Sequence, residues 1–272
     1  MPLSIEQKRA NFRKLHESGC FVIPNPWDAG SAKLLAGMGF KALASTSSGF
    51  AWTIGKSDNH VSVDDVLAHL KVLSDATDLP VNADFEAGFA KEPEGVAANV
   101  TRGVATGVAG ISIEDSTGDK SAPLFEFKLA VERMRAARKA IDATGQNVML
   151  VGRCESYLVG QPDLKATIER LLAYSEAGAD CLYAPAIKSK DDIVAVVKAV
   201  APKPVNLLVG MPGGMSVPEI ADLGVRRISV GGALARSAWG GFFRAAREIA
   251  EKGTFTEFAN AVPHPEINAK FQ

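Results

Sequence analysis

Residues 107–115 read GVAGISIED, and this stretch shows a unit that recurs along the chain. Its first glycine suits the left-handed turn that ends a helix. The apolar run after it is typical of a strand buried on both faces of a parallel sheet, and two acidic residues follow where that run ends. Similar runs follow Gly178 and Gly224. The pattern therefore predicts a repeated unit of helix, buried strand and polar strand end.

Eight such runs alternate with segments that carry apolar residues at three- and four-residue spacing. The predicted strands span residues 21–23, 42–44, 80–83, 109–113, 148–151, 181–183, 205–209 and 227–230. The predicted helices include residues 63–77, 93–106, 125–144, 164–177, 190–200 and 217–223. This alternation predicts a parallel sheet of the α/β class. Eight units in about 250 residues favour a closed (β/α)8 TIM barrel over an open, doubly wound sheet.

The chain shows no linker rich in Gly, Ser or Pro, so residues 1–272 are expected to form a single barrel domain. The repeat ends before the C-terminus, and we expect about residues 240–272 to form a helical extension. Aromatic residues in this tail suggest that it packs on a face of the barrel or on a neighbouring subunit.

Composition excludes several classes of protein. The 30 Lys and Arg residues balance 31 Asp and Glu residues, which argues against a broad nucleic-acid-binding surface. Three scattered cysteines are too few for a disulfide framework or a thiolate zinc site. The polar N-terminus predicts no signal peptide, and no apolar run is long enough for a membrane span. We therefore expect a cytoplasmic protein with no membrane partner.

Acidic residues gather at the predicted strand ends, which is where barrels of this kind build their active sites. Asp84 and Glu86 follow the third strand, and Glu114 and Asp115 end the fourth. On an extended backbone Asp84 and Glu86 point the same way. Several carboxylates at one point need a cation, and an all-oxygen set suits Mg²⁺, with Mn²⁺ as a substitute. The alternative is that these acids cap a helix or pair with an arginine.

Other polar groups also follow predicted strands. Arg153 could hold a carboxylate or phosphonate through its bidentate guanidinium, or form a salt bridge at the barrel mouth. The hydroxyl run at residues 45–48 offers donors to an anionic oxygen. The glycines of residues 210–214 and 231–232 lie where many barrels bind phosphate, although tight turns also need glycine. All four histidines miss the strand ends, so a Ser-His-Asp or histidine–zinc mechanism has little support.

Five stretches together resemble the phosphoenolpyruvate mutase/isocitrate lyase superfamily, over about residues 21–240. They read PNPWDAGSAKLLAGMGFKALASTSSGFAWTIGKSD from residue 24, LPVNADFEAGF from 79, GVAGISIEDS from 107, VGRCES from 151 and GVRRISVGGALARSAWG from 224. The resemblance implies a (β/α)8 barrel, often tetrameric, with a C-terminal helix exchanged between neighbouring subunits. It also implies Mg²⁺ and an α-keto acid or its enolate, beside which a C–C or P–C bond is made or broken.

The resemblance also implies roles for individual residues. Asp84 corresponds to the direct metal ligand, and Glu86, Asp58 and Glu114 to its water-mediated supports, although the family more often has Asp where Glu86 stands. Arg153 corresponds to the clamp for a substrate carboxylate. The loop that holds the enolate oxygen and carboxylate corresponds to Ser47, Ser48 and Gly49, with Ser45 or Thr46 as neighbouring alternatives.

Three departures from the family patterns bear on the reaction. Residues 116–123, STGDKSAP, lack the cysteine and histidine of the loop in isocitrate and methylisocitrate lyases. Tyr183 and the two residues after it stand where mutases and phosphonopyruvate hydrolases carry a histidine. Asn206 stands where oxaloacetate decarboxylases tend to carry one. The proton donor therefore stays open between Tyr183, Glu155 and a metal-bound water.

The predicted function is a Mg²⁺-dependent carbon–carbon lyase or decarboxylase. It would act through an enolate on a small α-keto or α-hydroxy dicarboxylate resembling oxaloacetate or methylisocitrate, in a homo-oligomer, a dimer or tetramer. The predicted catalytic residues are Arg153, Glu114, Asp58 and Tyr183; the substrate-binding residues are Ser45, Ser47, Ser48, Gly49, Arg153 and Asn206; the metal-binding residues are Asp84, Glu86 and Glu114.

Three other functions stay open. A P–C bond enzyme, such as a phosphonopyruvate hydrolase or phosphoenolpyruvate mutase, would use the same barrel. A phosphate-binding barrel aldolase would use the glycines after the last two strands, and its Schiff-base version needs a lysine, for which Lys188 is the candidate. A barrel that only binds a ligand would account for the missing general acids.

Overall fold

The structure is a computed structural model that describes residues 2–271, and its centre is one sheet of eight parallel strands. The strands are β1 (Phe21–Ile23), β2 (Leu43–Ala44), β3 (Val81–Asp84), β4 (Gly110–Glu114), β5 (Met149–Arg153), β6 (Cys181–Tyr183), β7 (Val205–Leu208) and β8 (Arg227–Ser229). All eight predicted strands are confirmed, with ends that differ by at most two residues. From β2 to β8 each strand pairs with the next one in sequence, and β1 pairs with β8 but not with β2.

The pairing of β1 with β8 bends the sheet into a nearly closed barrel, which confirms the (β/α)8 fold and excludes the open, doubly wound sheet. Between β1 and β2 the seam is narrow. The backbone N–H of Ala44 donates to the carbonyl of Pro24 at 3.0 Å, directly after β1 ends.

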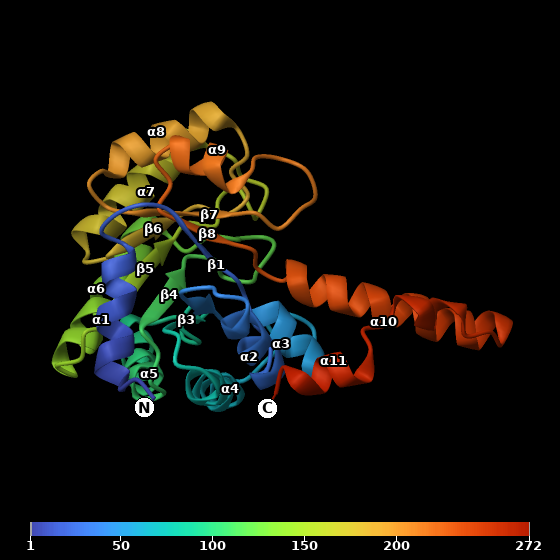
Figure 1. The fold of residues 1–272 in the computed structure, drawn as a ribbon. Coiled ribbons are helices and arrows are strands. Elements are labelled where there is room, and N and C mark those ends of the chain that lie inside the picture. The colour runs from blue at the N-terminus through green and yellow to red at the C-terminus, as the bar shows by residue number, and fades with distance from the viewer. Residues whose placement is uncertain (1, 272) are drawn as a thin grey trace.

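Helices surround this barrel (Figure 1). They are α1 (Ile5–Leu15), α2 (Ala29–Gly37), α3 (Ser47–Thr53), α4 (Val63–Ala76), α5 (Pro93–Ala105), α6 (Phe127–Ala143), α7 (Leu164–Glu176), α8 (Lys190–Val200), α9 (Val217–Asp222), α10 (Ala233–Lys252) and α11 (His264–Ala269), with a 3₁₀ turn, η1 (Thr256–Asn260). Gly107 and Gly178 have φ angles of 91° and 108°, so each ends a helix and turns the chain into the next strand, as the sequence predicts.

The inside of the barrel is partly apolar and partly polar. Phe12 of α1 lies fully buried among the inward-facing apolar side chains, which include Ile23, Met149 and Val151. This contact closes the end of the barrel opposite the carboxyl ends of the strands. A larger apolar layer fills the space between the strands and the outer helices. The strands are thus held from both sides, and only their carboxyl ends are free to build a site.

Helix α10 leaves the barrel and projects away from it, as Figure 1 shows. It begins at Ala233, and its outward side carries Phe242 and Phe243, which are 59% and 58% exposed. The chain then turns at Gly253, and α11 returns toward the barrel, where the Phe271 ring lies about 4 Å from the position a Cβ atom on Gly30 would occupy. The helical extension therefore starts earlier than the sequence pattern indicates.

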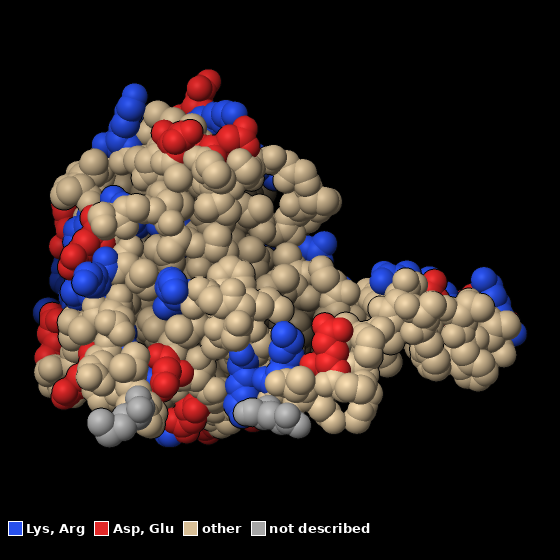
Figure 2. All heavy atoms as spheres, in the orientation of Figure 1, with Lys and Arg blue, Asp and Glu red and all other residues tan. Residues whose placement is uncertain are grey.

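Two surface properties bear on possible partners. On the face shown in Figure 2, Lys and Arg side chains are interspersed with Asp and Glu and form no continuous basic area. Within residues 2–271, no helix is both long and apolar enough to cross a membrane.

Candidate active site

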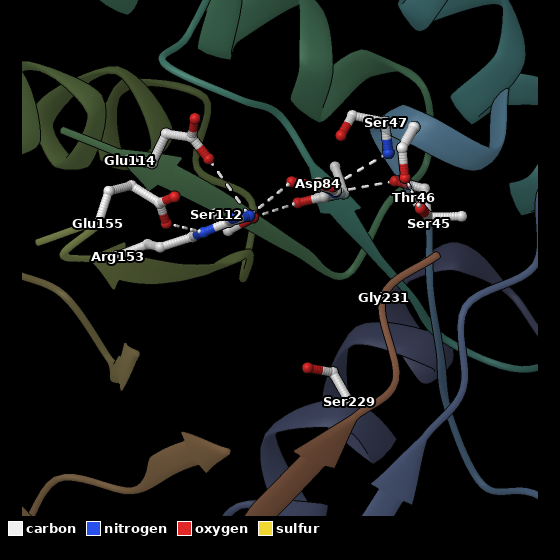
Figure 3. Close-up of polar contacts among 12 residues, drawn as sticks. Ser45, Thr46, Ser47, Asp84, Ser112, Glu114, Arg153, Glu155, Ser229 and Gly231 are labelled. Carbon is white, nitrogen blue, oxygen red and sulfur yellow. Dashed lines mark hydrogen bonds and ion pairs between the residues drawn. The ribbon is translucent and has the colours of Figure 1, made fainter. Parts of the chain in front are cut away.

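Asp84 lies at the centre of a polar cluster at the carboxyl ends of β2 to β5 (Figure 3). Its backbone N–H donates to Ser45 Oγ at 2.8 Å, and its Oδ2 accepts from the backbone N–H of Ser47 at 3.0 Å. Its Oδ1 accepts from Arg153 Nη1 at 3.2 Å. Strand pairing explains the cluster, because residues at the ends of adjacent parallel strands meet at one rim. The predicted convergence of Ser45, Ser47, Asp84 and Arg153 is thus what the structure shows.

Arg153 is surrounded by three carboxylates. Its Nη1 lies 3.2 Å from Asp84 Oδ1 and 3.2 Å from Glu114 Oε2, and its Nε donates to Glu155. The guanidinium also lies 5.1 Å from the centre of the Tyr183 ring, in a cation–π contact. Arg153 is therefore held by salt bridges at the mouth, and any other anion there would compete with these three carboxylates for it.

Glu86 and Asp58 bring two further carboxyl groups to the same place. Burial, with the nearby Asp84 and Asp58 carboxylates, raises the pKa of Glu86 to about 8. Burial and Asp84 also raise the pKa of Asp58. Burial raises the pKa of Glu114 as well, against the opposing effect of Arg153. The cluster thus holds more carboxylates than the single guanidinium can neutralise.

The extended-backbone argument for Asp84 and Glu86 is wrong in its geometry. Strand β3 ends at Asp84, and Glu86 has a φ of 47°, in the left-handed region. Glu86 reaches the cluster because this turn brings it back, and its carbonyl accepts the backbone N–H of Glu114 at 3.0 Å.

The donor set fits a hard divalent cation that keeps much of its water. Glu86 Oε1 is buried and has no hydrogen-bond partner among the described residues, so on losing its proton this carboxyl group could bind a cation. Within residues 2–271, no three His, Cys, Asp or Glu side chains converge closely enough to bind one ion together. Mg²⁺ often uses one or two carboxylates and several waters, which suits this spacing.

Asp115 faces away from the mouth and supports it from behind. Its Oδ1 accepts the backbone N–H of Glu155 at 2.8 Å, and its Oδ2 accepts from the Tyr174 hydroxyl at 2.6 Å and from Arg170 Nη1 at 3.2 Å. These bonds fix the chain at Glu155, whose carboxylate in turn holds Arg153. Asp115 therefore positions Arg153 through the backbone and does not face the mouth.

Asn25 is a site residue that sequence reasoning missed. Its Nδ2 donates to the carbonyl of Ser45 at 2.9 Å, and its Oδ1 accepts the backbone N–H groups of Val230 and Gly231, each at 2.9 Å. A phosphate bound after the last strand would need these two N–H groups as donors. Because both already donate to Asn25, they are not available to a phosphate. An asparagine between two prolines directly after β1 was the available signal, because the prolines have no backbone N–H to donate and a side-chain amide can both donate and accept.

The other predicted site residues, Ser48, Gly49, Tyr183 and Asn206, lie at different distances below the mouth of the barrel. Ser48 Oγ is 3.2 Å from Thr46 Oγ1, and the Gly49 N–H donates to that same hydroxyl at the start of α3. Tyr183 is buried, and burial raises its pKa to about 12. Asn206 lies below the mouth, with both its amide atoms bonded within the barrel.

Two other observations concern the chain just beyond the strand ends, at Lys188 and at Gly232. Lys188 is exposed beyond β6, which does not suit a Schiff-base lysine, because such a lysine is usually desolvated. At the start of α10, a Cβ atom on Gly232 would lie 2.8 Å from Ser48 Oγ and 3.3 Å from the Trp52 ring, so the helix leaves the barrel in direct contact with the hydroxyl loop.

Comparisons with known proteins identify relatives of this chain. The structure of a protein assigned as a lyase/mutase from Burkholderia cenocepacia J2315 has a TM-score of 0.94 and 48% identity, covering 98% of this chain and 96% of that one. The 2-methylisocitrate lyase of Escherichia coli is 33% identical over 59% of this chain and 55% of its own length. The oxaloacetate decarboxylase of Chromohalobacter salexigens is 28% identical over 80% and 77%.

The family model described as phosphoenolpyruvate phosphomutase matches residues 12–250, which include the whole barrel and most of α10. Because that match spans most of the sequence, this chain belongs to the phosphoenolpyruvate mutase/isocitrate lyase superfamily, a group of lyases and mutases.

Proposed function

We propose that this protein is a Mg²⁺-dependent lyase that cleaves a carbon–carbon bond in a small α-keto or α-hydroxy dicarboxylate. The observation that carries the proposal is the excess of carboxylates around Asp84, with the unpaired Glu86 oxygen on one side and Arg153 on the other. Relatives named 2-methylisocitrate lyase and oxaloacetate decarboxylase support this class of substrate.

Asp84 would hold the ion directly, with Glu86, Asp58 and Glu114 acting through water. Mg²⁺ bound there would supply a positive charge that stabilises the negative charge developing on the substrate's keto oxygen. The Ser47 N–H bond to Asp84 fixes the carboxylate from the opposite side. Mn²⁺ has the same preference for oxygen ligands and would be expected to substitute.

The chain's own residues would then orient the substrate and manage the proton. Arg153 binds the far carboxylate, for which its planar guanidinium is suited. The Ser47 and Ser48 hydroxyls lie at the rim where the enolate oxygen would form. With oxaloacetate, the bond between C3 and the far carboxylate breaks, its electron pair enters the enolate, and that carboxylate leaves as carbon dioxide. Tyr183 keeps its proton at neutral pH, since its pKa is raised to about 12, and can donate it to the enolate carbon.

The test is turnover with Mg²⁺ over oxaloacetate, 2-methylisocitrate, 2,3-dimethylmalate and phosphonopyruvate. We expect activity on a dicarboxylate, and loss of both activity and Mg²⁺ binding in Asp84→Asn. The matched control is Asp222→Asn, an exposed residue at the end of α9. Activity on phosphonopyruvate alone would favour the P–C alternative. No activity on any compound, together with no Mg²⁺ binding, would reject the proposal.

We also propose that the protein acts as a homo-oligomer in the cytoplasm. A groove of about 560 Å³ runs between α3 and α10, and Trp52, Trp239 and Phe243 line it. The exposed Phe242 and Phe243 on α10 extend this apolar surface. Large exposed apolar areas of this kind mark association surfaces, and a second copy of the chain presents the same aromatic helix.

A further inference from the structure

A cation without a counter-ion lies inside the barrel below the mouth. Arg227, the first residue of β8, is 2% exposed and forms no salt bridge with any carboxylate in residues 2–271. Its Nε donates to Asn206 Oδ1 at 2.8 Å, and its Nη1 approaches Asn82 Oδ1 at 3.4 Å. A buried charge is costly unless it is paired, so a structural role alone does not account for arginine at this position.

The hydrogen bonds that link Arg227 to Asn206 and Asn206 to Ser229 are all donated toward the mouth. Arginine can only donate hydrogen bonds, so Arg227 fixes the Asn206 amide with its oxygen downward and its NH₂ group upward. That NH₂ group donates to Ser229 Oγ at 2.9 Å. Because Ser229 Oγ is thus an acceptor toward Asn206, its own hydrogen is free to point elsewhere. Arg227 thus orients a chain of two aligned hydrogen bonds that ends at Ser229 Oγ.

Ser229 ends β8 at the floor of the mouth. Figure 3 shows its hydroxyl directed into the space that Asp84 and Arg153 face from the other side. Two other serines at this rim are held by the backbone, since Ser45 Oγ accepts the Asp84 N–H and Ser112 Oγ donates to the carbonyl of Ala83. The Tyr183 phenol oxygen lies within hydrogen-bond reach of Ser229, so a substrate oxygen in the mouth would compete with it for the Ser229 hydrogen.

A second donor is needed at this place. Arg153 already contacts three carboxylates, so it can offer only part of its guanidinium to a ligand. We propose that Ser229 is a specificity-determining residue that donates a hydrogen bond to the second carboxylate of the substrate. Asn206 and Arg227 are its positioning residues, and they hold the Ser229 hydroxyl in the donating orientation. This inference rests on the proposed function and deepens it, because it selects dicarboxylates over monocarboxylates.

Two ligands of equal length test the selection. L-Malate and 2-hydroxybutyrate differ only in having a carboxylate or a methyl group at the far end, and calorimetry with Mg²⁺ present measures the affinity for each. We expect the wild-type protein to prefer malate. Ser229→Ala should lower malate affinity about tenfold or more, as loss of a hydrogen bond to a charged group does, and leave 2-hydroxybutyrate affinity unchanged. Ser229→Thr keeps the hydroxyl and should keep the preference.

Asn206→Asp tests the direction of the bonds. An aspartate can only accept from Ser229, so the hydroxyl would turn its hydrogen downward, away from the ligand. The same change gives Arg227 a buried salt-bridge partner. We expect Asn206→Asp to lower malate affinity as Ser229→Ala does and to leave 2-hydroxybutyrate affinity unchanged, with a thermal midpoint at or above the wild-type value. A residue with a merely structural role would not lose selectivity while stability is kept.

The outcomes separate this inference from the proposed function. Unchanged malate preference in Ser229→Ala, or a wild-type protein without that preference, overturns the role of Ser229 even if a substrate is turned over. Loss of preference in Ser229→Ala and Asn206→Asp, with retention in Ser229→Thr, supports it even if no compound of the panel is turned over.

Discussion

Replacing Asn25 with alanine is expected to destabilise the barrel, because one side chain closes two seams. Alanine removes the bond to the Ser45 carbonyl and both bonds from the N–H groups of Val230 and Gly231. A buried hydrogen bond contributes about 1 kcal/mol net, so the loss should reach about 3 kcal/mol. For a chain of this size, each kcal/mol lowers the thermal midpoint by about 2–4 °C. The expected decrease is therefore about 6–12 °C.

Differential scanning calorimetry of the purified protein measures this decrease. Asn260→Ala is the matched control, because Asn260 is exposed and donates a single bond to Glu257 at 3.2 Å. Its midpoint should change by less than about 1 °C. Asn25→Asp keeps the acceptor for the two N–H groups and loses the donor to Ser45, so it should fall between alanine and the wild type. A shift of 2 °C corresponds to a loss of about 1 kcal/mol or less in the free energy of unfolding. A midpoint for Asn25→Ala within 2 °C of the wild type would therefore refute this account of the seam.

Three further changes have defined outcomes. Arg153→Lys keeps the charge and loses the planar fork, so steady-state kinetics should show kcat/KM lower by about 10- to 100-fold, and an unchanged value would contradict the clamp. The pKa of Glu86 in the folded chain is about 8, above its ordinary value of 4.5, so the stability of the metal-free protein should fall as pH rises between these values. Glu86→Gln removes this loss, so in EDTA the thermal midpoint of the variant should rise relative to that of the wild type from pH 5 to pH 9. A constant difference between the two midpoints would be evidence against the raised pKa. Phe242→Asp places a charge on the exposed side of α10, and light scattering should then show smaller species than for the wild type; an unchanged mass would exclude this surface from the assembly.

The strands could be predicted because their signals are local. A glycine that ends a helix, an apolar run and a polar residue recur within about ten residues, as in residues 107–115, and that pattern does not depend on distant partners. Helix α3 was harder, because Thr46 and Ser47 are typical of a loop. In the structure, Thr46 caps the helix by accepting the Gly49 N–H, so the hydroxyl run is partly a helix start.

The site could be predicted where barrel geometry alone places the residues. Asp84, Glu114 and Arg153 meet because their strands are adjacent and end at the same rim. The roles of Asn25 and Asn206 depend on partners far away in sequence, and Asn25 bonds to a residue 205 positions later. The left-handed turn at Glu86 also has no local signal, because that residue is not a glycine.

The close approach of Gly232 to Ser48 means that the first turn of the long C-terminal helix lies directly against the hydroxyl loop. A tilt of the first turn of α10 would therefore press Gly232 against the hydroxyl loop. A shortened form of the protein for biophysical work should retain the first turns of this helix, since a cut placed too early would remove the contact with Ser48 and Trp52 together with the protruding arm.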